Sequence, residues 1–380
     1  MTDKPRLWGQ VWERISGSPT SMRPTIPIRE NDSAAPRKRF EPGKHYFSVV
    51  INEMFLAESR QWVSEYDPMA LVVTEFSYGG ERVTTPFVVG PALINAHVKE
   101  VPLGFRLTDT KVAGIHPYTG GSLVATIVLA QIRRNSYASR LLQVVESIST
   151  VFPAGVALGP HLKVARTVLT AVEALFGMAD TKPLIGERWE YNSDIQAAME
   201  PGYFALVNAA EKTKGLADLR AEKGRLVSLS STTPYRSADF LLFSLVRHER
   251  RSDIEELEVY KLFNTALRDA ASVDEGAWPR AKAGLVSLYR ELVTSPDLTW
   301  EQANELMNTL RDKVVAAHKT SAEFQLLSAD TKLMELAPGQ APSRGPARDA
   351  LETLGVPAGV DHDVRLGRLA EVHKLLELGN

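Results

Sequence analysis

Residues 71–89 read LVVTEFSYGGERVTTPFVV, and this stretch carries the clearest structural signal in the chain. Two runs rich in β-branched and aromatic residues, 71–76 and 82–89, flank the turn sequence Tyr78-Gly79-Gly80. Such residues favour an extended backbone, and adjacent glycines accept the positive φ angles of a tight turn between antiparallel strands. The stretch therefore predicts a β-hairpin.

Runs of similar composition lie on both sides of this hairpin. They predict further strands at residues 46–51, 105–112, 122–132, 184–191, 203–208, 225–229 and 240–247. Turns rather than regular helices separate most of these runs, which favours an antiparallel sandwich over a doubly wound parallel sheet. Two helices are expected near residues 136–177, because apolar residues recur there at helical spacing after a cap at Asn135 or Ser136.

After Arg251 the periodicity of the sequence becomes helical. Ser252-x-x-Glu255 predicts a capping box at the start of a first helix, and Thr299-x-x-Gln302 predicts the start of a third. The charge run 247–251, Arg-His-Glu-Arg-Arg, stands between strand and helix and is expected to be solvated, as charge runs usually are.

These patterns predict an α+β protein in four parts. The main body is a mainly antiparallel, β-sandwich-like domain with a two-helix insertion, followed by an all-α helical domain. The boundaries are residues 1–43 for a flexible proline-rich arm with a short amphipathic segment, 44–251 for the β domain, 252–335 for the helical domain, and 336–380 for a linker with a terminal amphipathic helix.

Composition narrows the classes of function. The chain has 380 residues, 44 basic and 46 acidic, so its even charge argues against a dedicated nucleic-acid binder. It has no cysteine, which excludes thiol nucleophiles and thiolate metal sites, and its eight histidines are dispersed. We therefore expect no metal and no other cofactor. The sequence has no apolar signal core and no run long enough to span a membrane, which favours the cytoplasm.

Motifs specific for phosphate-binding loops, dinucleotide folds, esterase elbows and zinc proteases do not occur in the sequence. A site assembled from scattered residues stays open. The loop 116–121 places His116, Tyr118, Gly120 and Gly121 together, which combines an acid or base, a phenol and a backbone that could approach a ligand. The alternative is an ordinary strand connection in which the tyrosine packs and the glycines make the turn.

Apolar segments near both chain ends indicate contacts with other molecules. Trp8 and Trp12 lie on one helical face of the arm, and Leu369 and Leu376 belong to the terminal amphipathic segment. Side chains this large are costly to leave in water, so they either fold back on the chain or bind a partner.

The leading hypothesis is therefore a non-catalytic protein-binding or assembly component, that is, an adaptor or accessory protein. It would bind other proteins or a second copy of itself. Accessory components of bacterial multi-protein systems offer an analogy for this layout. The first alternative is a hydrolase that uses His116 and Asp109 from β-domain loops. The second is a membrane-surface protein that binds through Trp8 and Trp12, which is less favoured because no lysine-rich polar face accompanies them.

Overall fold

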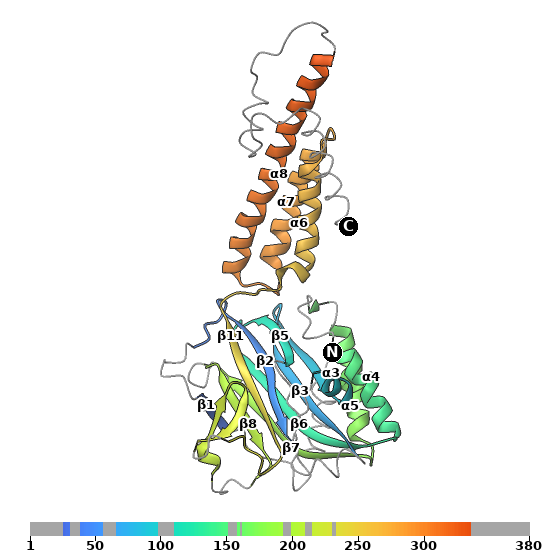
Figure 1. Ribbon diagram of the computed structural model, residues 1–380, viewed down its shortest axis with the longest axis vertical. Helices are drawn as coiled ribbons and strands as arrows, with labels where there is room; N and C mark the ends of the chain where they lie inside the picture. The colour runs from blue at the N-terminus through green and yellow to red at the C-terminus, as the bar shows by residue number, and fades with distance from the viewer. Residues whose placement is uncertain are drawn as a thin grey trace, which may run out of the picture. The chain divides into compact units, whose positions relative to one another are not determined.

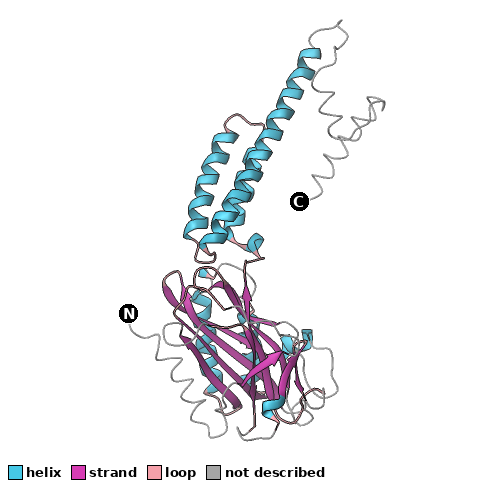
Figure 2. Cartoon of the chain, turned by 90° about the vertical axis from the view of Figure 1, so that its left-hand side faces the viewer, coloured by secondary structure: helices cyan, strands magenta, loops and turns pink. Residues whose placement is uncertain are grey.

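The computed structural model describes residues 26–30, 39–55, 66–97, 110–150, 158–159, 162–192, 199–209, 215–229 and 233–335. These residues fall into two compact units. The first contains the described residues of 1–266 together with 282–311, and the second contains 267–281 with the described residues from 312 onward. All described strands, drawn in magenta in Figure 2, belong to the first unit.

Two β-sheets form the body of the first unit. The seven-stranded sheet has the order β10-β9-β1-β8-β11-β2-β5, and the four-stranded sheet has the order β4-β3-β6-β7. Adjacent strands are antiparallel, except that β1 runs parallel to β9. The strand bounds are β1 Ile26–Glu30, β2 Tyr46–Phe55, β3 Tyr66–Tyr78, β4 Glu81–Val89, β5 Thr110–Pro117, β6 Ser122–Arg133, β7 Thr181–Asn192, β8 Gly202–Val207, β9 Leu219–Glu222, β10 Arg225–Ser228 and β11 Phe240–His248.

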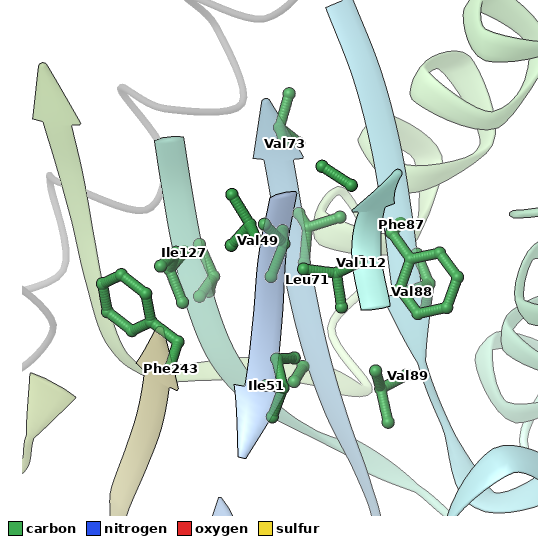
Figure 3. Close-up of a cluster of buried hydrophobic side chains, with 14 of the residues drawn as sticks. Val49, Ile51, Leu71, Val73, Phe87, Val88, Val89, Val112, Ile127 and Phe243 are labelled. Carbon is green, nitrogen blue, oxygen red and sulfur yellow. The ribbon is translucent and has the colours of Figure 1, made fainter. Parts of the chain in front are cut away.

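The core lies between the two sheets. Val49 and Ile51 from β2 and Phe243 from β11 meet Leu71 from β3 and Ile127 from β6 in one buried cluster (Figure 3). Each of these side chains is 2% exposed or less. Alternate residues of a strand point to the same face, so the apolar alternation of β2 supplies this surface. The predicted α+β class with a sandwich-like β part is confirmed.

Three helices cover the other face of the four-stranded sheet (Figure 1): α3 Pro91–His97, α4 Tyr137–Ser149 and α5 Leu162–Phe176. Helices α4 and α5 are the predicted insertion, and Ser136 caps α4 by accepting a 3.1 Å hydrogen bond from the backbone N–H of Ser139. Because the four-stranded sheet is covered on both faces, its central strand β6 is an almost continuous apolar run.

The C-terminal part of the described chain is helical, with α6 Glu258–Ala271, α7 Ala277–Thr294 and α8 Trp300–Glu335. Thr299 caps the N-terminus of α8 as predicted, because its Oγ1 accepts a 3.4 Å hydrogen bond from the backbone N–H of Gln302. The predicted capping box at Ser252 is wrong. A short 3₁₀ helix, η3 Ile254–Glu256, precedes α6, and Asp253 instead binds the Arg251 side chain.

The predicted boundaries of the four parts stay a prediction. Residues 1–25 and 336–380 lie outside the described residues, and β1 is the one described element within the arm 1–43. In the part of the chain that the structure describes, no helix is long and apolar enough to cross a membrane.

Candidate functional site

His116 does not line an open site. Its side chain is 3% exposed and stacks on Phe76, with ring centroids 4.6 Å apart, while Phe47 contacts it at 5.9 Å. Burial, with a smaller contribution from the positive charge of Arg251, lowers the pKa of His116 to about 3. The imidazole is therefore neutral at physiological pH, and its Nδ1 has no hydrogen-bond partner among the described residues. This placement gives His116 the role of a core side chain.

The remaining residues of the 116–121 loop pack against the segment 40–45. Tyr118 is 4% exposed, and its ring meets Phe40 edge-on at 5.7 Å. Its backbone N–H donates to the carbonyl of His45, and its carbonyl accepts from Gly43. Gly120 and Gly121 have φ angles of +88° and +75°, which make the turn. The loop is a packed strand connection, in which Tyr118 packs on Phe40 and the two glycines make the turn.

The other residues singled out from the sequence cannot be placed. Trp8, Trp12, Leu369 and Leu376 lie outside the described residues, as does Asp109. The partner-binding and membrane hypotheses built on them stay predictions. The hydrolase hypothesis also stays a prediction, because Asp109 lies outside the described residues. The burial of His116 does not support it.

A serine–histidine pair that the sequence did not reveal joins two neighbouring strands. Ser48 Oγ on β2 lies 2.8 Å from Nε2 of His248 on β11. The geometry resembles a nucleophile and its base, but Ser48 is 1% exposed. A nucleophile must be reached by its substrate, so we interpret this contact as a cross-strand hydrogen bond that holds β2 to β11.

A second feature missed from the sequence is a buried polar junction, defined here as Tyr46, Tyr78, Arg251, Asp297, Thr299 and Gln302. Arg251 Nη1 lies 3.3 Å from Oδ1 of Asp297, and the Tyr78 hydroxyl donates to Oδ2 at 3.0 Å. Burial raises the pKa of Asp297, and the arginine and the tyrosine oppose that shift. Burial also raises the pKa of Tyr78.

The junction ties the strands to the segments that begin the helical part. The Tyr46 hydroxyl accepts from the backbone N–H of Thr299 at 2.8 Å. The Gln302 amide donates to the carbonyl of Arg251 at 2.8 Å and accepts from its N–H at 2.9 Å. The expectation that the whole 247–251 run is solvated is wrong, because Arg251 is 2% exposed. Its partner Asp297 is far away in sequence, so local charge patterning could not reveal the pairing.

Most of the exposed large apolar side chains belong to the C-terminal part of the described chain. Among the described residues, ten large apolar side chains are exposed, and seven of them follow residue 254: Leu262, Val273, Val286, Tyr289, Trp300, Phe324 and Leu326. On α7, Val286 is 52% exposed and Tyr289 is 46% exposed, and the half-buried Leu285 and Val293 continue the same side of the helix. We call these four residues the α7 stripe.

Comparisons with protein-family models, with curated proteins and with solved structures found no match for this chain. Among the described residues, no group of three or more His, Asp or Glu side chains is arranged to hold a metal ion.

Proposed function

We propose that this chain is a non-catalytic protein-binding component of a multi-protein assembly, an adaptor or accessory protein that binds its partner through the C-terminal helices. The observation that carries the proposal is the α7 stripe, where exposed Val286 and Tyr289 share one helix face with Leu285 and Val293. Exposed apolar surface that is gathered rather than scattered marks interaction sites in soluble proteins.

The α7 stripe is the part of this surface best suited to a partner helix or groove. Val286 and Tyr289 are three residues apart on one helix and therefore neighbours on its surface. Tyrosine is enriched in interfaces because its ring is apolar and its hydroxyl is polar. Arg290, the residue after Tyr289, is exposed and supplies a polar rim.

The β part supplies a rigid support for this surface. Its two sheets share one close-packed core, and the buried polar junction fixes the residues that lead into α6 and α8. Loops and helices held by such a scaffold can bind without losing much conformational freedom. The cytoplasmic location and the analogy with bacterial multi-protein systems are part of this proposal.

The proposal is tested with two matched double variants of the full chain. Val286→Ser with Tyr289→Ser removes the exposed part of the α7 stripe. Val144→Ser with Tyr137→Ser removes the same residue types from α4, where they are 54% and 68% exposed. Each tagged protein is expressed in its source cell, cross-linked, and purified for quantitative mass spectrometry, and self-association is followed by sedimentation velocity.

We expect a specific protein, or a second copy of this chain, to associate with the wild type and with the α4 variant. The amount of this partner that co-purifies with the α7 variant should be at least tenfold lower than the amount that co-purifies with the wild type. Equal retention by both variants would contradict a docking role for α7, and a wild type that stays monomeric and retains no protein would remove the proposal.

A further inference from the structure

A cavity of about 280 Å³ opens in the second unit, between the α6–α7 turn and α8. Val273 and Ala322 line it together with Trp278. The Trp278 indole lies flat on the ring of His318, with centroids 3.9 Å apart and planes 2° from parallel. The acidic residues Asp274 and Glu275 of the turn also border the cavity.

The cavity walls are held in place by side chains of α8. Ser321 Oγ donates to the carbonyl of Ser272 at 3.2 Å, and Gln325 Nε2 donates to the carbonyl of Val273 at 2.7 Å. These bonds fix the turn against the helix without any ligand. The cavity is therefore preformed, so an occupant would not have to order its walls.

The lining of the cavity is mixed. Val273, Trp278 and Ala322 form its apolar wall, and the remaining lining residues are polar, charged or glycine. Val273, on this wall, is 60% exposed, so the cavity is open to solvent at its apolar side. Cofactor and drug-sized ligands occupy cavities of roughly 300–1,000 Å³. A cavity just below this range, with an apolar wall of three residues, suits one or two side chains of a docked segment better than a cofactor.

The chain itself supplies a segment within reach. Helix α8 continues past Gln325 to Glu335, a rise of about 15 Å, and the sequence then runs on through residues 336–380. The 29 residues 336–364 correspond to a random-coil end-to-end distance of ~30 Å, a chain length sufficient for the last residues to reach the cavity. Tethering of this kind gives an effective concentration in the millimolar range.

The chemistry of that segment complements the cavity. Leu366, Leu369, Val372 and Leu376 recur at helical spacing, which gathers them on one side of an amphipathic helix. Between residues 365 and 376 there are three basic residues, Arg365, Arg368 and Lys374, and one acidic residue, Glu371. This positive excess matches the acidic pair on the α6–α7 turn.

We infer that residues 365–376 dock into the α6–α7/α8 cavity of their own chain, with leucine side chains in the cavity and basic side chains toward Asp274 and Glu275. The segment then covers the exposed side chain of Val273 within the monomer. This inference is independent of the α7 stripe, which lies in the other unit, and of any partner protein.

The absence of cysteine allows a direct test in the full chain. Val273→Cys is combined in turn with Leu366→Cys, Leu369→Cys and Leu376→Cys, and each pair is oxidised with oxidised glutathione. A disulfide requires Cα atoms about 4.4–6.8 Å apart, so it reports proximity. Val144→Cys, at a position 54% exposed on α4, replaces Val273→Cys in the control pairs.

At least one Val273→Cys pair should form a disulfide within the monomer ten times faster than its Val144→Cys control. In that pair, one of Leu366, Leu369 and Leu376 is the cysteine. Replacing the other two leucines with Asp should return the rate of disulfide formation to the control value. Rates equal to the control in all three pairs would overturn the inference. A disulfide-linked dimer as the main product would also overturn it, because the occupant would then be a second copy.

Discussion

Arg251 and Asp297 face each other inside the protein, and both side chains are almost completely withdrawn from water, at 1% and 5% exposure. Asp253 binds the other side of the guanidinium, with Nε 2.6 Å from its Oδ1. A buried charge is tolerated when it is paired and hydrogen-bonded, and becomes very costly when its partner is removed. The pair therefore makes the connection between the β part and the helices sensitive to single substitutions.

Arg251→Met should lower the free energy of unfolding by about 3–5 kcal/mol, because it leaves the carboxylate of Asp297 buried without its cation. Urea unfolding followed by circular dichroism measures this change. The adjacent Arg250 provides the control. Its ion pair with Glu305 is solvent-exposed, with side-chain exposures of 68% and 45%, so Arg250→Met should cost less than about 1 kcal/mol. Similar losses in the two variants would contradict the structural role of the buried pair.

Tyr78→Phe should destabilise the protein by about 1–3 kcal/mol, since it removes the hydroxyl that donates to Asp297 and leaves a buried acceptor less satisfied. The phenyl ring keeps the packing of β3. Tyr137→Phe, at a position 68% exposed on α4, removes the same hydroxyl from the surface and should have little effect. Comparison of the two unfolding midpoints in urea checks the prediction, which fails if the midpoints shift equally.

The stability of the protein should fall with acid in a way that depends on His116. Its pKa drops from 6.5 to about 3 in the folded protein, so between these values the unfolded chain binds more protons. The stabilisation by the neutral imidazole is complete above pH 6.5 and is lost as the pH falls toward 3.

His116→Leu removes this contribution. Between pH 6 and pH 4, the wild type should lose up to ~1.4 kcal/mol more per pH unit than the variant. Urea unfolding at several pH values gives both slopes, and parallel slopes would show that His116 titrates normally.

Gly90→Ala should destabilise the protein by about 1–3 kcal/mol through steric conflict. The carboxylate of Glu146 accepts hydrogen bonds from the backbone N–H groups of Gly90, Ala92 and Leu93 at 2.7–3.1 Å. A Cβ at position 90 would lie 2.7 Å from Oε2 of Glu146 and disturb all three bonds.

Gly159→Ala is the matched control for this substitution, because a Cβ there meets no atom within 4 Å. Thermal unfolding of the two variants should give a clearly lower midpoint for Gly90→Ala alone. A wild-type midpoint for Gly90→Ala would show that the Glu146 carboxylate moves aside without cost.

Local patterns predicted most elements of this fold. The hairpin of β3 and β4 is confirmed, and Gly79 and Gly80 have the positive φ angles, +60° and +82°, that the turn requires. The predicted N-terminal caps, Ser136 of α4 and Thr299 of α8, are also confirmed. In each case, the residues that determine the structure lie within a few positions of one another.

What the sequence could not reveal depends on contacts between distant residues. Arg251 and Asp297 are 46 positions apart, and Tyr46 and Thr299 are 253 apart, so their burial follows from the tertiary fold alone. The same reason explains the loop 116–121. Its composition is typical of a ligand-binding loop, but its residues pack against residues 40–45, which are distant in sequence. The parallel pairing of β1 with β9 joins strands of only five and four residues. Periodicity is uninformative in strands this short.

The pairing of β2 with β11 has a consequence for synthesis on the ribosome. β2 ends at Phe55, but its antiparallel neighbour β11 begins only at Phe240. At 5–20 residues per second, the nascent chain presents one open edge of β2 for about 10–40 s. The four-stranded sheet is complete much earlier, because β7 ends at Asn192. Newly made chains therefore pass through a stage at which a ribosome-associated chaperone can shield the unpaired edge of β2, and translation pauses before residue 240 would prolong this stage.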